Sequence, residues 1–97
     1  MTIVYPAVFE YADDGINISF PDIENCFTCA FSDEEAVRMA QEVLEIFLHG
    51  EKADDLPVPS DMYDIAADGI KKYIRKISVN MSVSDGILYS PDVTEFR

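Results

Sequence analysis

The sequence is poor in the residues on which most catalytic and nucleic-acid-binding sites depend. It has one histidine, two cysteines and no tryptophan, and it contains only 7 Lys and Arg residues against 19 Asp and Glu residues. The resulting net charge of −12 repels phosphate backbones, so the chain alone is a poor candidate for binding nucleic acid. The same field would speed encounter with a basic partner, although solubility alone would equally account for the acidic surplus.

Long apolar runs are also missing. No apolar stretch approaches the ~20 residues that span a bilayer. The chain also does not open with a signal peptide, which would have a positively charged start, an apolar stretch and a cleavage site. We therefore expect a cytoplasmic protein without a membrane partner, in which both cysteines are reduced thiols. The hydrophobic share of 48% is typical of a folded domain, and we expect residues 1–97 to form one.

The sequence has no glycine-rich phosphate loop and no calcium-loop spacing, so we expect no cofactor and no metal. Cys26 and Cys29 have the spacing of a redox pair, but they fall in a predicted strand, where positions i and i+3 point to opposite faces. We interpret them as ordinary core cysteines. His49 lies in the last turn of a predicted helix, where its ring would interact with terminal carbonyls. We predict no catalytic residue.

Alternating apolar and polar residues predict three short strands, at 3–11, 16–20 and about 26–31. Asp13-Asp14-Gly15 is expected to form a hairpin turn, because glycine readily adopts the positive φ that such turns need. Pro6 has no amide hydrogen, so its nitrogen should face a sheet edge or an irregularity.

A capping box predicts the start of a helix. The Ser32 hydroxyl can accept a hydrogen bond from the amide of Glu35, and the Glu35 carboxylate can reach back to the amide of Ser32. Gly50 is a suitable residue to follow the helix end. The apolar stripe of this helix, with a period near 3.6, consists of Ala36, Val37, Ala40, Val43, Leu44, Phe47 and Leu48.

The rest of the chain predicts shorter elements. In order these are a charged, proline-containing loop at 51–60, a helical turn at 61–68, a fourth strand at 72–83, a turn at Asp85-Gly86 and a short strand at 87–89. The basic cluster at 71–76 is expected in an edge strand, where it discourages aberrant pairing. Together the patterns predict an α+β fold of β-β-β-α-β order, with a small antiparallel sheet and one main helix on one face.

Several short motifs occur in an order and spacing that resemble one family. They are Tyr5-Pro6-Ala7, Gly15, Phe20-Pro21-Asp22 with Cys26 four residues later, Ser32-Asp33-Glu34-Glu35-Ala36, Ala40 and Pro57-Val58-Pro59-Ser60. Over about residues 4–60 the chain resembles the HicB family of bacterial antitoxins. The resemblance implies a partial ribonuclease-H-like fold without nuclease activity. It also implies binding to a small basic toxin of the HicA type, which cleaves RNA and whose active surface the antitoxin covers.

The resemblance ends before the C-terminus. Many relatives carry a ribbon-helix-helix or helix-turn-helix module there, whereas residues 85–97 have no helical periodicity and no basic face. We therefore expect no separate DNA-binding domain and no autonomous DNA binding. Self-association through an exposed strand edge, as a homodimer or higher homo-oligomer, is expected.

These considerations predict a protein that binds and neutralises a basic partner protein. The expected contact residues are seven acidic side chains: Asp13, Asp14, Asp22, Glu24, Glu34, Glu42 and Glu45. Two alternatives stay open. One is a stand-alone regulatory or scaffold domain without a toxin, and the other is a metal-dependent nuclease that uses the carboxylates at the strand ends, among them Asp13 and Asp22.

Overall fold

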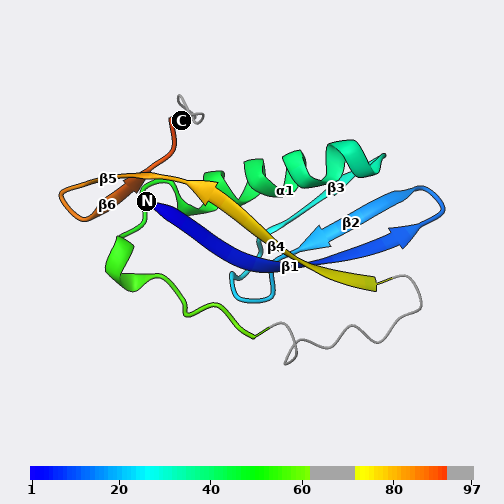
Figure 1. Cartoon of the computed structure of the whole chain (residues 1–97), viewed down its shortest axis with the longest axis horizontal. Helices are drawn as coiled ribbons and strands as arrows, with labels where there is room; N and C mark the ends of the chain where they lie inside the picture. Colours follow the sequence, from blue (N-terminus) through cyan, green and yellow to red (C-terminus); the bar gives the residue numbers. More distant parts are fainter. Residues whose placement is uncertain (62–71, 92–97) are drawn as a thin grey trace.

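A four-stranded antiparallel sheet and one long helix make up most of the structure (Figure 1). The computed structural model describes residues 1–61 and 72–91 of the chain. The architecture confirms the predicted α+β class with a small antiparallel sheet and one main helix. Within these two ranges, no helix combines the length and the apolar character needed to cross a bilayer.

β1 (Thr2–Ala12) is the longest strand and lies inside the sheet. It pairs antiparallel with β2 (Gly15–Ser19) on one side and with β4 (Lys72–Asn80) on the other. The short β3 (Phe27–Ala30) pairs antiparallel with β2, which gives the order β3-β2-β1-β4. The predicted strand positions are thus confirmed to within one or two residues, except at the end of β4.

One face of the sheet forms the core. Every second side chain of β1 from Ile3 to Phe9 is buried, and the register aligns Phe9 with Ile18 of β2 and Tyr5 with Ile77 of β4, all four of them buried. Since aligned residues of paired strands lie on the same face, these side chains form one apolar layer.

α1 (Asp33–Leu48) covers this layer. Its buried residues recur every four positions and join the strand side chains in a single hydrophobic cluster; they are Ala36, Ala40, Leu44 and Leu48. The predicted N-cap is confirmed, because the Ser32 Oγ accepts a hydrogen bond from the Glu35 amide at 3.3 Å. The predicted return contact is shifted by one residue: the Glu35 carboxylate accepts from the Phe31 amide at 3.0 Å instead of from Ser32.

The β1–β2 hairpin depends on Gly15. Its φ is +149°, and a Cβ atom at this position would lie 2.9 Å from the carbonyl oxygen of Ala30 in β3. The glycine therefore permits both the turn after Asp14 and the close approach of a third strand.

Pro6 is accommodated where β1 has a partner on one side only. It is aligned with Lys76 of β4, whereas pairing with β2 begins at Val8. The missing amide hydrogen of Pro6 therefore costs no ladder bond on the β2 side.

The fourth strand is shorter than predicted. β4 ends at Asn80, not at residue 83, because Asn80 is aligned with the first residue of β1 and no further partner is available. The Met81 amide donates instead to the carbonyl oxygen of Met1 at 2.8 Å. The chain then forms a separate hairpin of β5 (Ser82–Ser84) and β6 (Ile87–Tyr89).

The segment after α1 is more ordered than the predicted loop at 51–60. It contains a 3-10 turn, η1 (Ala53–Asp55), and pairs with the β5–β6 hairpin. The Gly50 amide donates to the carbonyl oxygen of Leu88, and the Ala53 amide donates to that of Gly86, both at 2.8 Å. The helical turn predicted at 61–68 lies, beyond Asp61, outside the described residues.

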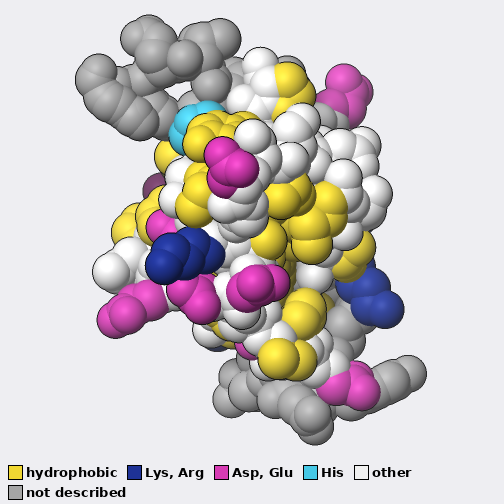
Figure 2. Space-filling view, turned by 90° about the vertical axis from the view of Figure 1, so that its left-hand side faces the viewer, with side chains coloured by type: hydrophobic (Ala, Val, Ile, Leu, Met, Phe, Trp, Pro, Cys, Tyr) yellow, Lys and Arg dark blue, Asp and Glu magenta, His cyan; other side chains and the backbone are white. Residues whose placement is uncertain are grey.

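The end of the molecule that carries this hairpin exposes hydrophobic side chains. Figure 2 shows them on this end face, together with scattered acidic side chains and few basic ones. Met1, Val83 and Tyr89 are exposed, and they belong to the N-terminus and the hairpin that meet here.

Candidate functional site

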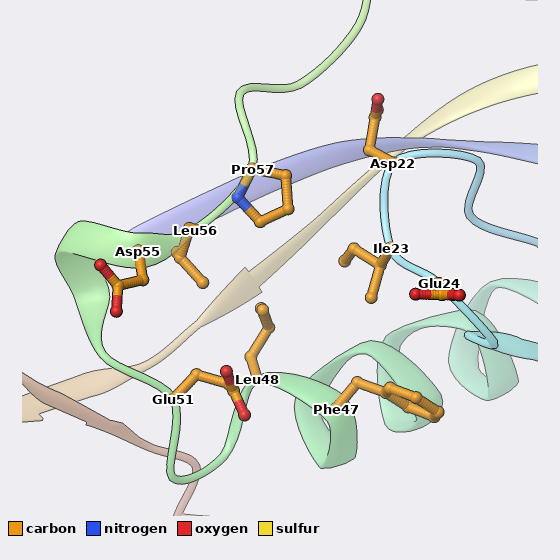
Figure 3. A pocket seen from close by; sticks show the side chains of 9 residues that line it. All are labelled: Asp22, Ile23, Glu24, Phe47, Leu48, Glu51, Asp55, Leu56 and Pro57. Atoms are coloured by element: carbon orange, nitrogen blue, oxygen red, sulfur yellow. The ribbon is translucent and has the colours of Figure 1, made fainter.

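A groove of about 440 Å³ opens where three segments of the chain meet (Figure 3). The segments are the turn between β2 and β3, the last turn of α1 and the stretch 51–57 that contains η1. The lining side chains are Asp22, Ile23, Glu24, Phe47, Leu48, Glu51, Asp55, Leu56 and Pro57. Apolar and acidic side chains thus share one depression, and no Lys or Arg is among them.

Apolar side chains form the floor of the groove. Figure 3 shows Ile23, Leu48 and Pro57 pointing toward its middle from three different segments. Leu48 is buried, whereas Ile23, Phe47 and Leu56 are half-buried and pack against the core cluster. The floor is therefore an outer part of the hydrophobic core that solvent still reaches, and covering it would be favourable.

Acidic side chains surround this floor. Glu24 lies at one end of the groove, and Glu51 and Asp55 lie at the other (Figure 3). All three are exposed, and within the described residues their carboxylates form no hydrogen bond or ion pair. We call these three residues the acidic rim. Their charges are free to attract a basic group that approaches the apolar floor.

The β2–β3 turn is held in shape by its own backbone. The Phe20 amide donates to the carbonyl oxygen of Cys26 at 3.0 Å, and the Ile23 amide donates to that of Phe20 at 3.1 Å. Asn25 completes the turn with a φ of +63°, a conformation that asparagine tolerates better than most residues. One wall of the groove is therefore fixed before any partner arrives.

Two further contacts fix the segment 57–60, which we call the strap. The Asp22 carboxylate accepts from the Ser60 amide at 2.9 Å and from the Ser60 hydroxyl at 2.5 Å. The Tyr5 hydroxyl donates to the carbonyl oxygen of Pro57 at 2.5 Å. Burial, followed by the charge of Asp22, raises the pKa of Tyr5, so the phenol keeps the proton that it donates.

The seven predicted contact residues do not form one cluster. Asp22 and Glu24 line the groove beside the last turn of α1, although the Asp22 carboxylate is already engaged by the strap. Asp13 and Asp14 are exposed at the tip of the β1–β2 hairpin, and Glu34 is exposed in the first turn of α1. Whether any of them contacts a partner stays a prediction.

The hairpin tip and the start of α1 lie at the same end of the molecule (Figure 1). The Tyr11 hydroxyl, two residues before the tip, donates to the Asp33 carboxylate at 2.5 Å, and this hydrogen bond is the main cause of the raised pKa of Tyr11. With 16 residues at about 1.5 Å each, α1 separates this end from the groove by about 24 Å.

The remaining two predicted residues lie along α1. Glu42 is exposed and forms an ion pair with Arg38 at 2.6 Å, as the i,i+4 spacing predicts, and Glu45 is half-buried. An exposed pair of this kind contributes little to stability. It does partly neutralise the acidic face of the helix.

Sequence reasoning missed Glu51 and Asp55 as site residues. They stand in a stretch that the sequence presents only as a charged loop, and nothing local indicates that this loop folds back beside residues 22–24. One signal that could have indicated them is the abrupt change after α1 from an amphipathic helix to a stretch of acids and prolines. A stretch of this composition at the end of a core helix must pass over the end of the core.

The cysteines and the histidine do not form a site. Cys26 is buried and precedes β3, whereas Cys29 is exposed, so the interpretation as core cysteines is right for Cys26 and wrong for Cys29. The His49 ring accepts a hydrogen bond at Nδ1 from the Ser90 amide at 3.1 Å, a partner that the sequence did not indicate. Within the described residues, no three His, Cys, Asp or Glu side chains come together as metal ligands.

The chain is similar in sequence to a phage protein. It is 28% identical over 74 residues to an uncharacterized 14.9 kDa protein from the rep-hol intergenic region of Haemophilus phage HP1. The match includes 76% of this chain, which spans about half the length (51%) of that relative. No family model matches the chain.

Two solved structures share the fold. A chain of a toxin–antitoxin complex from Streptococcus pneumoniae superposes with a TM-score of 0.69 and 28% identity, over 82% of this chain and 70% of that one. A chain of a HicA3–HicB3 toxin–antitoxin complex superposes with a TM-score of 0.58 and 18% identity, over 77% of this chain and 95% of that one. Both of these chains are thus components of toxin–antitoxin complexes, and one of them is also similar to this chain in sequence.

Proposed function

We propose that the chain is an antitoxin of the HicB type, which binds a small basic RNA-cleaving toxin of the HicA type and neutralises it by covering its active surface. The observation that supports this most strongly is the similarity in both fold and sequence to a chain of the pneumococcal toxin–antitoxin complex. The HicA3–HicB3 complex supports the HicB type through its fold.

A contact within the structure adds support. Two of the motifs that carry the HicB resemblance, Phe20-Pro21-Asp22 and Pro57-Val58-Pro59-Ser60, are 35 residues or more apart in the sequence. They meet through the Asp22–Ser60 hydrogen bonds. The motifs therefore have a common structural purpose, which is to position the strap beside the groove.

The charge of the chain fits such a partner. A protein that cleaves RNA must present positive charge to phosphates, and this chain carries a net charge of −12. The proposed antitoxin acts in the cytoplasm as a homodimer or higher homo-oligomer and does not bind DNA on its own. Within the described residues no strand pairs with the outer edge of β4, which offers a surface for self-association.

The test combines the purified chain with a HicA-type toxin, for which the reading frame next to its gene is the first candidate. We expect a stable complex and a loss of RNA cleavage that is complete near stoichiometric addition. An unrelated acidic protein of similar net charge serves as the control and should leave cleavage intact. Undiminished cleavage in the presence of excess chain would refute the proposal, and cleavage by the chain alone would favour the nuclease alternative.

A further inference from the structure

The groove brings several partly exposed apolar side chains together in one depression. Ile23, Phe47 and Leu56 are half-buried around the buried Leu48, and their outer atoms face solvent in one depression. A volume of about 440 Å³ lies in the lower half of the range of about 300–1,000 Å³ that is usual for ligand sites. It has room for a few side chains and not for a whole helix.

The acidic rim determines which kind of partner segment the groove can bind. Glu24 stands at one end of the floor, and Glu51 and Asp55 stand at the other (Figure 3). A neutral apolar segment would remove water from these carboxylates without compensation, which is unfavourable. A segment that places Lys or Arg on both sides of an apolar side chain would satisfy the rim and the floor together.

The groove is also pre-formed. Backbone hydrogen bonds fix the β2–β3 turn. The Asp22–Ser60 and Tyr5–Pro57 hydrogen bonds hold the strap beside the groove. The stretch after α1 is fastened to the β5–β6 hairpin from Gly50 to Ala53. A partner therefore need not order this surface when it binds, which reduces the entropic cost of association.

We propose that this groove is the docking site for a segment of the basic toxin in which one large apolar side chain is flanked by Lys or Arg. The inference rests on the proposed function and makes it more specific. It places the anchor of the complex at the C-terminal end of α1 and away from the hairpin tip, about 24 Å distant, where Asp13, Asp14 and Glu34 are exposed.

Two charge-matched variants test the position of the site. The groove variant is Glu24→Lys with Glu51→Lys and Asp55→Lys, and the control variant is Asp13→Lys with Asp14→Lys and Glu34→Lys. Three reversals take the net charge from −12 to −6 in both. With the HicA-type toxin as the probe, we expect the groove variant to bind about tenfold or more weakly and the control variant to change affinity by less than about threefold.

A third variant tests the apolar part of the proposal. Leu56→Ser removes half-buried apolar surface from the floor in a segment outside the main helix and sheet. We expect faster dissociation with an unchanged salt dependence, because the lost contact is apolar. Circular dichroism of all three variants shows whether each is folded, and an amide chemical-shift map of the wild-type complex locates the site without any substitution.

The outcomes separate this inference from the proposed function. Equal weakening by both triple variants, or a shift map centred on the hairpin tip, would overturn the docking site and leave the antitoxin role intact. A fall in homo-oligomer mass for the groove variant, with unchanged affinity for the toxin, would assign the groove to a second copy of the chain. If the wild-type chain forms no complex with the toxin, both proposals fail.

Discussion

At the scale of single residues, the two cysteines have opposite environments despite their close spacing. Cys26 is buried just before β3, and this burial raises its pKa to about 11 from an ordinary value of 9.0. Cys29 is exposed on the strand. Thiol reactivity depends on the thiolate and on access, so the two residues should react at very different rates.

We predict that a disulfide reagent at pH 8 modifies Cys29 quickly in the folded protein, and Cys26 only after unfolding. Cys29→Ser should abolish the fast phase, and Cys26→Ser should leave it unchanged. Two equally fast thiols would contradict this account.

The raised pKa of Cys26 also means that, as the pH rises, the unfolded state loses the Cys26 proton before the folded state does. The contribution of the protonated Cys26 thiol to the free energy of unfolding is therefore complete below about pH 9 and is lost as the pH rises toward 11.

Asp22 shows how the role of a residue depends on its neighbours. The sequence suggested a partner contact, because Asp22 is an acid in a turn. In the structure the carboxylate accepts two hydrogen bonds from Ser60, 38 residues later. Glu24, only two residues away, is exposed and has no such partner among the described residues. Sequence alone cannot separate these roles, because the difference arises from a distant segment.

At the scale of structural elements, the strap is fastened mainly through its two ends. The Tyr5 hydroxyl holds Pro57, and Asp22 holds Ser60. The residues between them are exposed, and Val58 is among the most exposed apolar residues of the described chain. The order of this segment therefore depends on a small number of hydrogen bonds, each worth about 1 kcal/mol.

We predict that Asp22→Ala releases the Ser60 end of the strap. The amide of Ser60 should exchange with solvent about tenfold faster, and the free energy of unfolding should fall by about 2 kcal/mol, because two hydrogen bonds are lost. Glu24→Ala is the matched control, since it removes a carboxylate from the same turn without breaking a hydrogen bond within the described residues. Asp22→Asn retains one acceptor and should have an intermediate effect. Equal protection of Ser60 in all three variants would show that the strap is held by other means.

The elements that could be predicted are those determined by local sequence. The three N-terminal strands, the helix and its Ser32 N-cap follow from periodicity and capping chemistry, which act over a few residues. The break at Met81 could not be predicted, because alternation continues through residue 83 and the strand ends only where its partner β1 ends. The limit is set by long-range pairing and not by local preference.

At the scale of the whole molecule, the groove was not predictable for the same reason. It needs residues near 22, 47 and 55 to meet, and each of these segments has an ordinary local explanation as a turn, a helix end and a loop. Net charge, by contrast, is a property of the sequence alone. It fits a basic partner without any structure, but it cannot indicate which of the acidic surfaces would receive one.

The net charge predicts a strong effect of salt on complex formation. The association rate with the HicA-type toxin should fall about tenfold or more between about 50 mM and about 500 mM NaCl, because screening shortens the range of the attraction. The dissociation rate should change much less. Stopped-flow mixing measures both rates, and the Leu56→Ser variant should show the same salt slope as the wild type. A flat association rate would exclude electrostatic steering.

The position of β1 in the sheet has a consequence for synthesis of the protein. β1 ends at Ala12, but its partner β4 starts only at Lys72. At roughly 5–20 residues per second, a ribosome needs about 3–12 s to make the intervening chain. During that interval one side of β1 has backbone groups without their eventual partner, and neighbouring nascent chains on the same messenger carry the same open edge. This open edge can therefore pair with that of a neighbouring nascent chain before β4 has been made.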